Sequence, residues 1–531
     1  MTEKSETAAG RNWPGAHVLS LDLRSLALLR VIYGALLFLD NLVRWSDIGA
    51  FYSEYGALPR RYLLEYGSND YWFSLHMVTG NIVWTHLLFL IQALATLALM
   101  VGWHTRWATL VSWLLLISIH ARNPMVLNGG DIYLRCILFW MLFLPTGHRW
   151  SMDAKQGRGD HYSWMASIKG NSIFGMSALV VLLQICYVYW FAALPKTDPA
   201  WTVTYTASEI ALTLDQFITP IGLFFRDSLS GEQLATLTFL VIWWEAWGPF
   251  FLWFPFDRGQ VRLIGIFGFT ALHAGFGGMM ELGFFAWTGA LTPFVLFPSW
   301  LWDSPLRRFS AWADGKFGSC EPAQGDSNYT WSREILLGFL IVYCFVWNMT
   351  NETLRPNWMR IPSGLTWIGH TLRLDQRWNM FSPGPLTEDG WYVIEGRFKD
   401  GRVLDLFSGK ELTWDKPKDV AHTYPNQRWR KYMMNLWLAE NSDYRLPFGQ
   451  YLSRKWNPNG RGPEELTGFD IVYMLEITNP DGTEQLPEKK VVWTHWCFEN
   501  PEKEKEHESQ LRKAIGNRKI PGFDSKGSTT D

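Results

Sequence analysis

The chain has 531 residues, of which 48% are hydrophobic and 16% aromatic, and its formal net charge is −2. So small a net charge gives no long-range attraction to nucleic acid, and we expect no nucleic-acid partner. The apolar residues are concentrated before residue 350 in long runs broken by short polar loops, whereas the remainder is charged and mixed. This unevenness favours a polytopic α-helical membrane protein followed by a β-rich extramembrane domain.

The first 20 residues are polar and lack the apolar core of a cleavable signal peptide. We interpret residues 1–20 as a cytoplasmic N-terminal segment and expect the first membrane span to act as its own insertion signal. No phosphate-binding loop, dinucleotide fingerprint, zinc-protease motif or nucleophile elbow occurs in a usable context. Nucleotide-dependent, metalloprotease and hydrolase functions therefore have no support in the sequence.

About nine segments within residues 21–350 have the apolar character expected of membrane-spanning helices. They are residues 26–44, 82–102, 107–120, 132–146, 173–194, 234–256, 263–280, 284–302 and 335–350. Trp and Tyr residues gather at the ends of these runs, as in the aromatic belts of membrane interfaces. Arg30, Asp40 and Asn41 lie in the first run and are expected to face the bundle interior or the interface, because a charge in lipid is costly.

The basic residues predict an orientation for these spans. If the N-terminus is cytoplasmic and the spans alternate, the inside loops hold Arg106, Arg149, Lys155, Arg158, Lys169, Arg258, Arg262, Arg307, Arg308, Lys316 and Arg333. Positive residues favour the cytoplasmic side, so this arrangement predicts a multi-pass protein, with a bacterial plasma membrane as the expected location. Lys196 and everything after residue 351 then lie on the extracytoplasmic side.

Five cysteines are present, and three of them sit inside apolar runs. They are Cys136, Cys186, Cys320, Cys344 and Cys497, and none forms a CxxC pair. We therefore predict buried free thiols, with neither a disulfide framework nor a metal site.

The stretch "ARNPMVLNGGDIYLR" holds the first polar group of the membrane region. Arg122, Asn123, Asn128 and Asp131 lie in a short loop, and Arg135 lies just inside the next helix. The Asn-Gly-Gly sequence favours a tight turn that can approach another group closely. Two interpretations are open: an Arg–Asp lock between two helices, or part of a polar pocket.

Lys196 follows Pro195 at the end of the apolar run "YVYWFAALPKTDPAW". A lysine at a helix end can extend to the membrane interface and act as an anchor. Alternatively, Asp198 pairs with the amine and Trp201 helps to desolvate it, which would favour a neutral amine acting as a general base.

Three further ionisable residues lie within the apolar runs. His273 and Glu281 occur in the glycine-rich stretch "FTALHAGFGGMMELGFF", and Glu245 occurs in "VIWWEAWGPFF". Such residues are costly in lipid, so they are either satisfied inside the bundle or part of a functional site.

The sequence after residue 350 predicts a β-rich domain over 351–500. "GWYVIEGRFKDGRVLDLFSG" alternates apolar and polar residues around Asp400-Gly401, which indicates a hairpin, and a second hairpin is predicted around Asp481-Gly482. Between them, "NQRWRKYMMNLWLAE" and "FGQYLSRKWN" have helical periodicity. Residues 501–531 are charged and predicted to be a disordered tail.

Three stretches of the chain together resemble the vitamin K-dependent γ-glutamyl carboxylase family. "YWFAALPKTDPAW" is similar to the segment with the family's catalytic lysine, "GHRWSMD" to its Trp-Ser-Val-Asp stretch, and "FDRGQVRLIGIFGFTALHAGFGGMMELGFF" to its histidine segment. The resemblance covers roughly residues 20–310 and fits the wider group of horizontally transferred transmembrane (HTTM) domain proteins. It implies that Lys196 occupies the position of the base and His273 that of the family's histidine.

The resemblance implies a carbon–carbon lyase that is also a quinol epoxidase. Its cofactor would be reduced vitamin K or a related lipid-soluble quinol, used with O2 and CO2. The lysine deprotonates the quinol, oxygen converts it to the epoxide through a strongly basic intermediate, and that base removes a γ-proton from a peptide glutamate before CO2 adds. The implied partners are the lipid bilayer, the quinone and a secreted or membrane peptide, and a dry pocket would protect the base from water.

The chain also departs from the family pattern. Gly129-Gly130-Asp131 stands where the eukaryotic carboxylase has Asn-Asn-His, and Ala274, Gly275 and Phe276 replace polar residues that follow the histidine. Quinol oxygenation without carboxylation is therefore also consistent with the sequence.

Two other function classes remain open from the residues. A non-catalytic maturation or export factor would present its external domain to a secreted protein, with Arg428, Arg430 and Lys431 docking an acidic peptide, unless these charges form an ordinary solvated helix face. A transporter would use the glycine-broken helix near His273, although no inverted repeat is visible.

Overall fold

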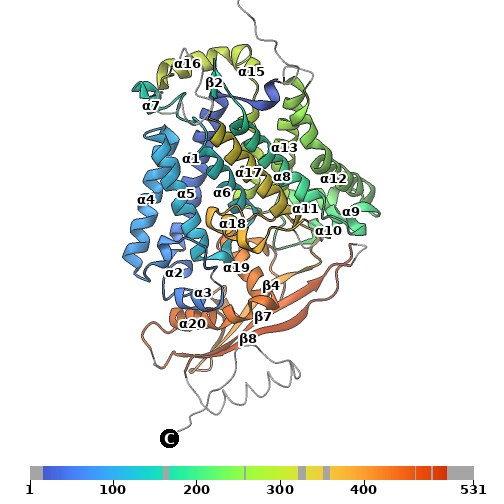
Figure 1. Ribbon diagram of the computed structural model, residues 1–531. Coiled ribbons are helices and arrows are strands. Elements are labelled where there is room, and N and C mark those ends of the chain that lie inside the picture. Colours follow the sequence, from blue (N-terminus) through green and yellow to red (C-terminus); the bar gives the residue numbers. More distant parts are fainter. Residues whose placement is uncertain are drawn as a thin grey trace, which may run out of the picture.

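Long helices form a bundle that stands on a twisted β-sheet in the computed structural model of the chain (Figure 1). The structure describes residues 16–67, 69–158, 167–255, 259–320, 330–350, 359–460, 462–479 and 482–498. The predicted tail 501–531, residue Asp481 and most of the predicted segment 1–20 lie outside these described residues.

Six helices of the described chain are long and apolar enough to cross a membrane. They are α1 (Leu23–Ser46), α4 (Ile82–Val101), α8 (Met176–Ala193), α12 (Gly231–Trp253), α13 (Gln260–Met279) and α17 (Trp331–Met349). Aromatic side chains on α12 are exposed, including Trp243, Trp247 and Phe250, which suits a face turned toward lipid. These helices support a multi-pass membrane protein.

The other three predicted spans are helical but shorter or more polar. They correspond to α5 (Thr105–Arg122), α6 (Gly129–Met141) and the broken segment formed by α14 (Phe284–Leu291), η5 (Thr292–Leu296) and α15 (Ser299–Asp303). Arg106, His120 and Arg122 lower the apolarity of α5, and α6 has only 13 residues. The expected count of about nine spans is therefore not confirmed, and six is the number that length and apolarity support in the described chain.

Short helices and turns connect the bundle at both ends. They are η1 (Ala16–Leu19), α2 (Ile48–Phe51), α3 (Arg60–Tyr66), η2 (Leu75–Met77), η3 (Pro124–Val126), α7 (Met152–Lys155), α9 (Pro199–Thr202), α10 (Ala207–Thr213), α11 (Pro220–Ser228), α16 (Arg307–Phe317), η6 (Ser363–Leu365) and α18 (Thr366–Leu372). At the upper end in Figure 1, α7, α15 and α16 lie near a small sheet with the strand order β1 (Ser20–Asp22), β3 (Ser172–Phe174), β2 (Ser167–Lys169). The sequence patterns above did not predict this small sheet.

The extramembrane domain contains a five-stranded antiparallel sheet with the order β6-β5-β4-β7-β8. Its strands are β4 (Glu388–Phe398), β5 (Val403–Asp405), β6 (Lys410–Glu411), β7 (Leu466–Ile477) and β8 (Glu488–Trp496). The hairpin predicted at Asp400-Gly401 is confirmed, and Gly401 adopts the positive φ of 88° that such a turn favours. The second hairpin is formed by β7 and β8, and Gly482 has a φ of 78°.

Helices lie between the two hairpins, as the periodicity predicted. They are η7 (Ala421–Thr423), α19 (Gln427–Trp437), η8 (Ala439–Tyr444) and α20 (Arg445–Trp456). Asn426 caps the N-terminus of α19 by accepting from the backbone N–H groups of Arg428 and Trp429. This cap places the basic start of α19 against the ends of the membrane helices.

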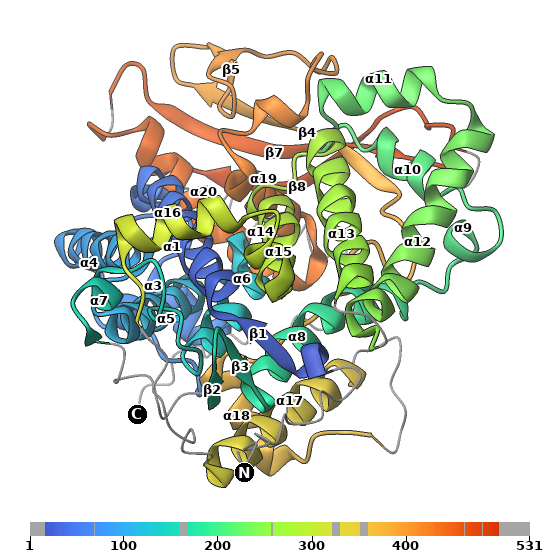
Figure 2. The same ribbon diagram turned by 90° about the horizontal axis from the view of Figure 1, so that it is seen from above.

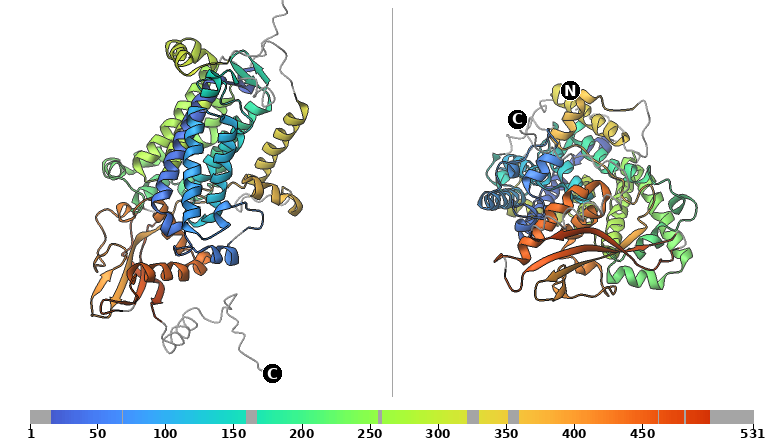
Figure 3. Two further views of the ribbon diagram at one scale, coloured as in Figure 1. Left: turned by 90° about the vertical axis from the view of Figure 1, so that its left-hand side faces the viewer. Right: turned by 90° about the horizontal axis from the view of Figure 1, so that it is seen from below.

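The sheet and its helices cover one end of the bundle, as the side view shows (Figure 3). Phe51, Ile119 and Val126 from the membrane half share one buried apolar cluster with Tyr432 and Phe448 from the extramembrane half. From above, α12 and α13 lie side by side on one flank (Figure 2). The two predicted domains, 21–350 and 351–500, therefore meet through a common core.

Candidate functional site

A cavity of about 830 Å³ lies where the membrane helices meet the extramembrane domain. Its volume is in the range of small-molecule sites, and its walls combine apolar rings with a few polar groups. The predicted site residues that line it are Lys196, His273, Glu245, Asn128 and Trp201, together with Arg430 and Lys431 from α19. Segments far apart in the chain thus converge on one chamber.

Lys196 lies at the membrane side of this cavity and is almost completely buried. Its side chain is 3% exposed and forms an ion pair with Oε2 of Glu245. The amine also lies 4.4 Å from the centre of the Trp201 ring, a cation–π contact. Lys196 therefore does not extend to the interface as an anchor would.

Asp198 was a predicted partner of this amine, but Glu245 holds that place. Asp198 instead caps the short helix α9, because its Oδ1 accepts from the backbone N–H of Ala200 at 2.8 Å. The backbone N–H of Asp198 donates to the carbonyl of Pro383, and the indole of Trp201 donates to the carbonyl of Phe381. Asp198 thus positions the segment that carries Lys196.

Glu245 lies inside helix α12, four residues before Pro249. Proline has no N–H, so the carbonyl of Glu245 lacks the usual donor four residues on. The Glu245 side chain is 7% exposed and reaches across to the end of α8, where Pro195 and Lys196 leave the helix. The ion pair therefore links two membrane helices at the wall of the cavity.

His273 projects from α13 into the same cavity and is 2% exposed. Its Nε2 lies 3.1 Å from the hydroxyl of Tyr189, whereas Nδ1 has no hydrogen-bond partner among the described residues. The Phe285 ring lies 5.1 Å from the imidazole. A Cβ at Gly289 would lie 2.2 Å from the imidazole, so only glycine at 289 leaves room for His273 in this position.

The Asn-Gly-Gly turn forms another part of the wall. Asn128 caps α6 by accepting from the N–H groups of Gly130 and Asp131, and its Nδ2 donates to Gln427 of α19 at 2.9 Å. A Cβ at Gly130 would lie 2.7 Å from the backbone nitrogen of Phe285, so glycine permits the close approach that the sequence predicted. Asn128 and Gly129 line the cavity.

Asp131 belongs to a separate buried cluster of four charges, formed with Asp40, Arg44 and Arg428. Arg44 donates to Asp40 at 2.7 Å and also to Asp131, while Arg428 donates to Asp40 at 2.6 Å and to Asp131 at 2.8 Å. All four side chains are at most 2% exposed. The predicted lock between charges exists, but its arginines are Arg44 and Arg428 rather than Arg122.

Arg122 and Asn123 are structural and do not line the cavity. Arg122 donates to the carbonyls of Leu58 and Ser53, both at 2.9 Å. Asn123 donates to the carbonyl of Phe51 and caps η3. These contacts satisfy the buried polar groups of a loop near the membrane boundary.

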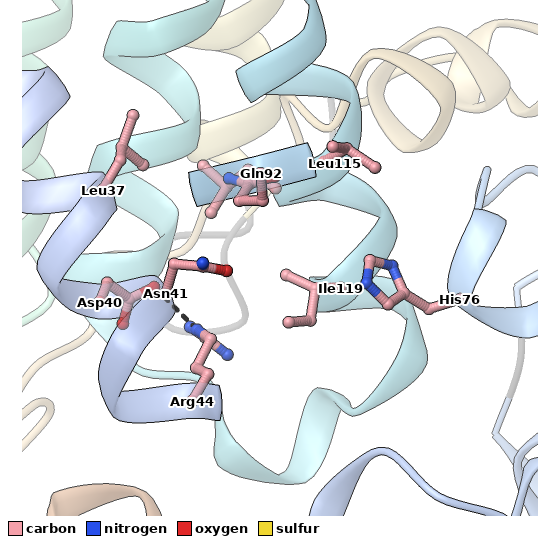
Figure 4. A pocket seen from close by; sticks show the side chains of 9 residues that line it. Leu37, Asp40, Asn41, Arg44, His76, Gln92, Leu115 and Ile119 are labelled. Carbon is pink, nitrogen blue, oxygen red and sulfur yellow. Dashed lines mark hydrogen bonds and ion pairs between the residues drawn. The ribbon is translucent and has the colours of Figure 1, made fainter. Parts of the chain in front are cut away.

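A much smaller cavity, of about 10 Å³, adjoins the four-charge cluster (Figure 4). Asp40, Asn41 and Arg44 of α1 line it together with His76 and Gln92, and Oε1 of Gln92 has no partner among the described residues. Its volume suits about one water molecule. This space therefore offers no room for a substrate.

Arg428 and Arg430 of α19 are buried and Lys431 is half-buried, contrary to the expectation of a solvated helix face. Arg428 is engaged in the four-charge cluster and is therefore withdrawn from any docking surface. Arg430 donates to the carbonyls of Gln216 and Glu281, and burial lowers its pKa to about 10. Lys431 lines the cavity, and burial lowers the pKa of its amine.

Arg135, which the sequence placed beside the first polar group, also lines the cavity, whereas Tyr189 on its wall was not predicted as a site residue. Tyr189 lies on α8, and its hydroxyl lies 3.1 Å from Nε2 of His273, a contact between distant segments that no local spacing indicates. Arg135 donates to the carbonyl of Arg373 at 3.1 Å and also to Asp375, so its role depends on residues remote in sequence. Glu281 is not part of the lining and contributes its carbonyl to Arg430.

The cysteines and carboxylates give no sign of a metal centre in the described part of the chain. All five cysteines are free thiols, as predicted, and four are buried. No three His, Cys, Asp or Glu side chains of the described ranges gather closely enough to hold an ion.

Comparison with known proteins gives no assignment. The chain matches no protein-family model, no curated protein and no solved structure, so the geometry of the cavity is the basis for any functional conclusion.

Proposed function

We propose that the protein is a membrane enzyme of the γ-glutamyl carboxylase type, within the HTTM group, in which Lys196 deprotonates a lipid-soluble quinol. One observation carries this proposal: Lys196 and His273, matched to the family by separate sequence stretches, line the same cavity. A site at the end of the membrane helices would receive an apolar ring from lipid.

The cavity suits a flat ring with polar groups at its edge. Its volume of about 830 Å³ exceeds that of one quinone ring system and leaves space for a second reactant. Phe276 and Phe285 supply apolar walls, and His273 lines the cavity beside them. These features fit reduced vitamin K or a related quinol.

A bound quinol would supply, with O2, the strong base that family members use to prepare glutamate for CO2. Lys196 would take a hydroxyl proton once its amine is neutral, and the aromatic walls would keep bulk water away from that amine. The Tyr189 hydroxyl lies 3.1 Å from Nε2 of His273 and helps to fix the orientation of the imidazole. Gly289 holds open the space that His273 fills.

The same proposal includes an extracytoplasmic location for the cavity and the extramembrane domain, with the N-terminus in the cytoplasm of a bacterial cell. Arg430 and Lys431 reach the cavity from its extramembrane side and would attract the carboxylate of a secreted or membrane peptide. Both carboxylate oxygens of Asp131 accept hydrogen bonds from Arg44 or Arg428. The position where the family carries a histidine therefore contributes no acid–base group here. Quinol oxygenation is therefore the core of the proposal, and carboxylation is its extension.

Replacing Lys196 tests this function. We expect Lys196→Ala to lower quinol-dependent O2 uptake and epoxide formation in membranes by roughly 10²–10⁴-fold, the usual contribution of a positioned general base. Lys316→Ala is the control, because this lysine lies on α16 outside the cavity lining. Unchanged turnover in Lys196→Ala would contradict the proposal.

A non-catalytic maturation factor is the second candidate, and the outer edge of the sheet favours it. Strand β8 ends the sheet within the described residues, and Val491 on it is 64% exposed. An exposed edge can accept a strand from a partner. If Lys196→Ala keeps full biological function while charged substitutions on β8 abolish it, this second function replaces the first.

A further inference from the structure

The buried ion pair between Lys196 and Glu245 has a consequence for how the amine becomes a base. Both side chains lie in a cavity wall, with exposures of 3% and 7%, and Oε2 of Glu245 contacts Nζ directly. Trp201 adds a cation–π contact at 4.4 Å, so the resting amine is held as an ammonium. An ammonium cannot accept a proton, and therefore a base at this position needs a group that first takes its proton.

We propose that Glu245 is this proton acceptor, so that the base of the site is the lysine–glutamate pair rather than Lys196 alone. The inference rests on the proposed function of Lys196 as a base. Glu245 is the carboxylate that the structure places in contact with the amine, since Asp198 is occupied as the cap of α9.

The proton movement leaves the total charge of the site unchanged. An N–H bond of the Lys196 ammonium breaks and an O–H bond forms at Oε2 of Glu245, which converts an ion pair into a neutral pair. The lone pair on Nζ then takes the proton of a ligand hydroxyl, restoring the ammonium beside the oxygen that has become negative. A net charge in an apolar cavity would be costly, and this sequence never creates one.

The fold supports this assignment at Glu245. Pro249 withholds a backbone donor from the Glu245 carbonyl in α12, and Pro195 ends α8 just before Lys196, so the pair forms where both helices are irregular. A pair that served only to hold two helices together would not need to face a cavity. Here both partners line the same cavity as His273.

The first test measures proton sharing without any quinol. Reductive methylation by formaldehyde, followed by peptide mass spectrometry, reports how often the Lys196 amine is neutral at pH 7. We expect Glu245→Gln to methylate Lys196 roughly tenfold faster than the native protein, because a desolvated amine without its carboxylate favours the neutral form. Glu245→Asp should stay near the native rate, and Glu334→Gln is the matched control, because Glu334 is also a buried membrane-helix carboxylate but pairs with Arg333.

The second test separates proton acceptance from mere positioning. Glutamine leaves the amine neutral but cannot take up the proton that Lys196 gains in each cycle, so Glu245→Gln should keep a single deprotonation and lose steady-state quinol-dependent turnover by roughly 10²-fold, while its thermal unfolding temperature stays close to native. Glu245→Asp should recover most of the turnover. Unchanged methylation in Glu245→Gln, or full turnover in that variant, would overturn the inference.

Failure of this inference is distinguishable from failure of the proposed function. If Lys196→Ala keeps quinol turnover, the proposed function is wrong whatever the methylation of Glu245→Gln shows. If Lys196→Ala is inactive but Glu245→Gln is fully active, only the role of Glu245 is wrong.

Discussion

At the scale of single residues, burial decides how ionisable groups behave. The sequence left Lys196 open between an interface anchor and a base, and Arg428 open between a docking group and a solvated charge, yet both are buried and paired with carboxylates. Asp389 is also buried, with 2% of its surface exposed, but its Oδ1 has no hydrogen-bond partner among the described residues. Burial and the neighbouring charge of Asp215 raise the pKa of Asp389 to about 7.

This raised pKa predicts a pH-dependent stability. The folded state holds the proton of Asp389 more tightly than the unfolded state, so its contribution is full below pH 4 and is lost as the pH rises through 7. We expect Asp389→Asn, which cannot ionise, to be more stable than the native protein at pH 8 by on the order of 2–4 kcal/mol and about equal to it at pH 4.

Thermal unfolding of detergent-solubilised protein between pH 4 and pH 8 measures this difference. The exposed Asp227 of α11 provides the control substitution Asp227→Asn. An Asp389→Asn curve parallel to the native one across this range would rule the prediction out.

At the scale of secondary-structure elements, the four-charge cluster fixes α19 to α1 and α6. Two carboxylates and two guanidinium groups balance each other, and each is at most 2% exposed. Because α19 also carries Arg430 and Lys431 into the large cavity, the cluster sets the position of that wall. Burying ion pairs adds little net stability, but removing one partner leaves an uncompensated charge.

Arg428→Met should therefore destabilise the protein by about 3–5 kcal/mol, because Asp40 and Asp131 would then share only Arg44. Adding Asp131→Asn to this variant removes the excess negative charge, so we expect the double variant to be more stable than Arg428→Met alone. Thermal unfolding of the single and double variants, with the exposed Lys455→Met as control, measures both effects. A double variant less stable than Arg428→Met would refute the charge-balance explanation.

At the scale of the whole molecule, the membrane half and the extramembrane half share one core. Phe51 and Val126 from the bundle pack in the same cluster as Tyr432, Phe448 and Leu466 from the domain. The hydroxyl of Tyr432 also donates to the carbonyl of Ala57 at 3.1 Å. Because each half packs against side chains of the other in this cluster, the two halves are expected to unfold together.

Tyr432→Ala tests this cooperation. Tyr432 is completely buried, and loss of its ring should cost about 3–5 kcal/mol, as large core truncations do. We expect tryptophan fluorescence and proteolytic cleavage of both halves to report one common transition at a lower temperature. Two separated transitions in the native protein would show instead that the halves are independent.

The sequence by itself determined most of the long elements of this protein. Apolar length predicted about nine spans, which include the six long apolar helices of the described chain, and alternation with Asp-Gly turns identified both hairpins, because these signals depend on neighbours along the chain. It also singled out Lys196 and His273, since ionisable residues in apolar runs are costly unless they serve a purpose. Such positions and periodicities can be recognised without knowing which residues pack against them.

The tertiary structure decided which partner each residue has. Glu245 rather than Asp198 holds Lys196, and Arg428 rather than Arg122 holds Asp131, although the contacting residues are far apart in the sequence. Local spacing favours near neighbours, but α12 and α19 bring these distant side chains into buried contact, where electrostatic interactions are strong. The sequence named the base of the proposed site, and packing alone revealed the carboxylate that pairs with it.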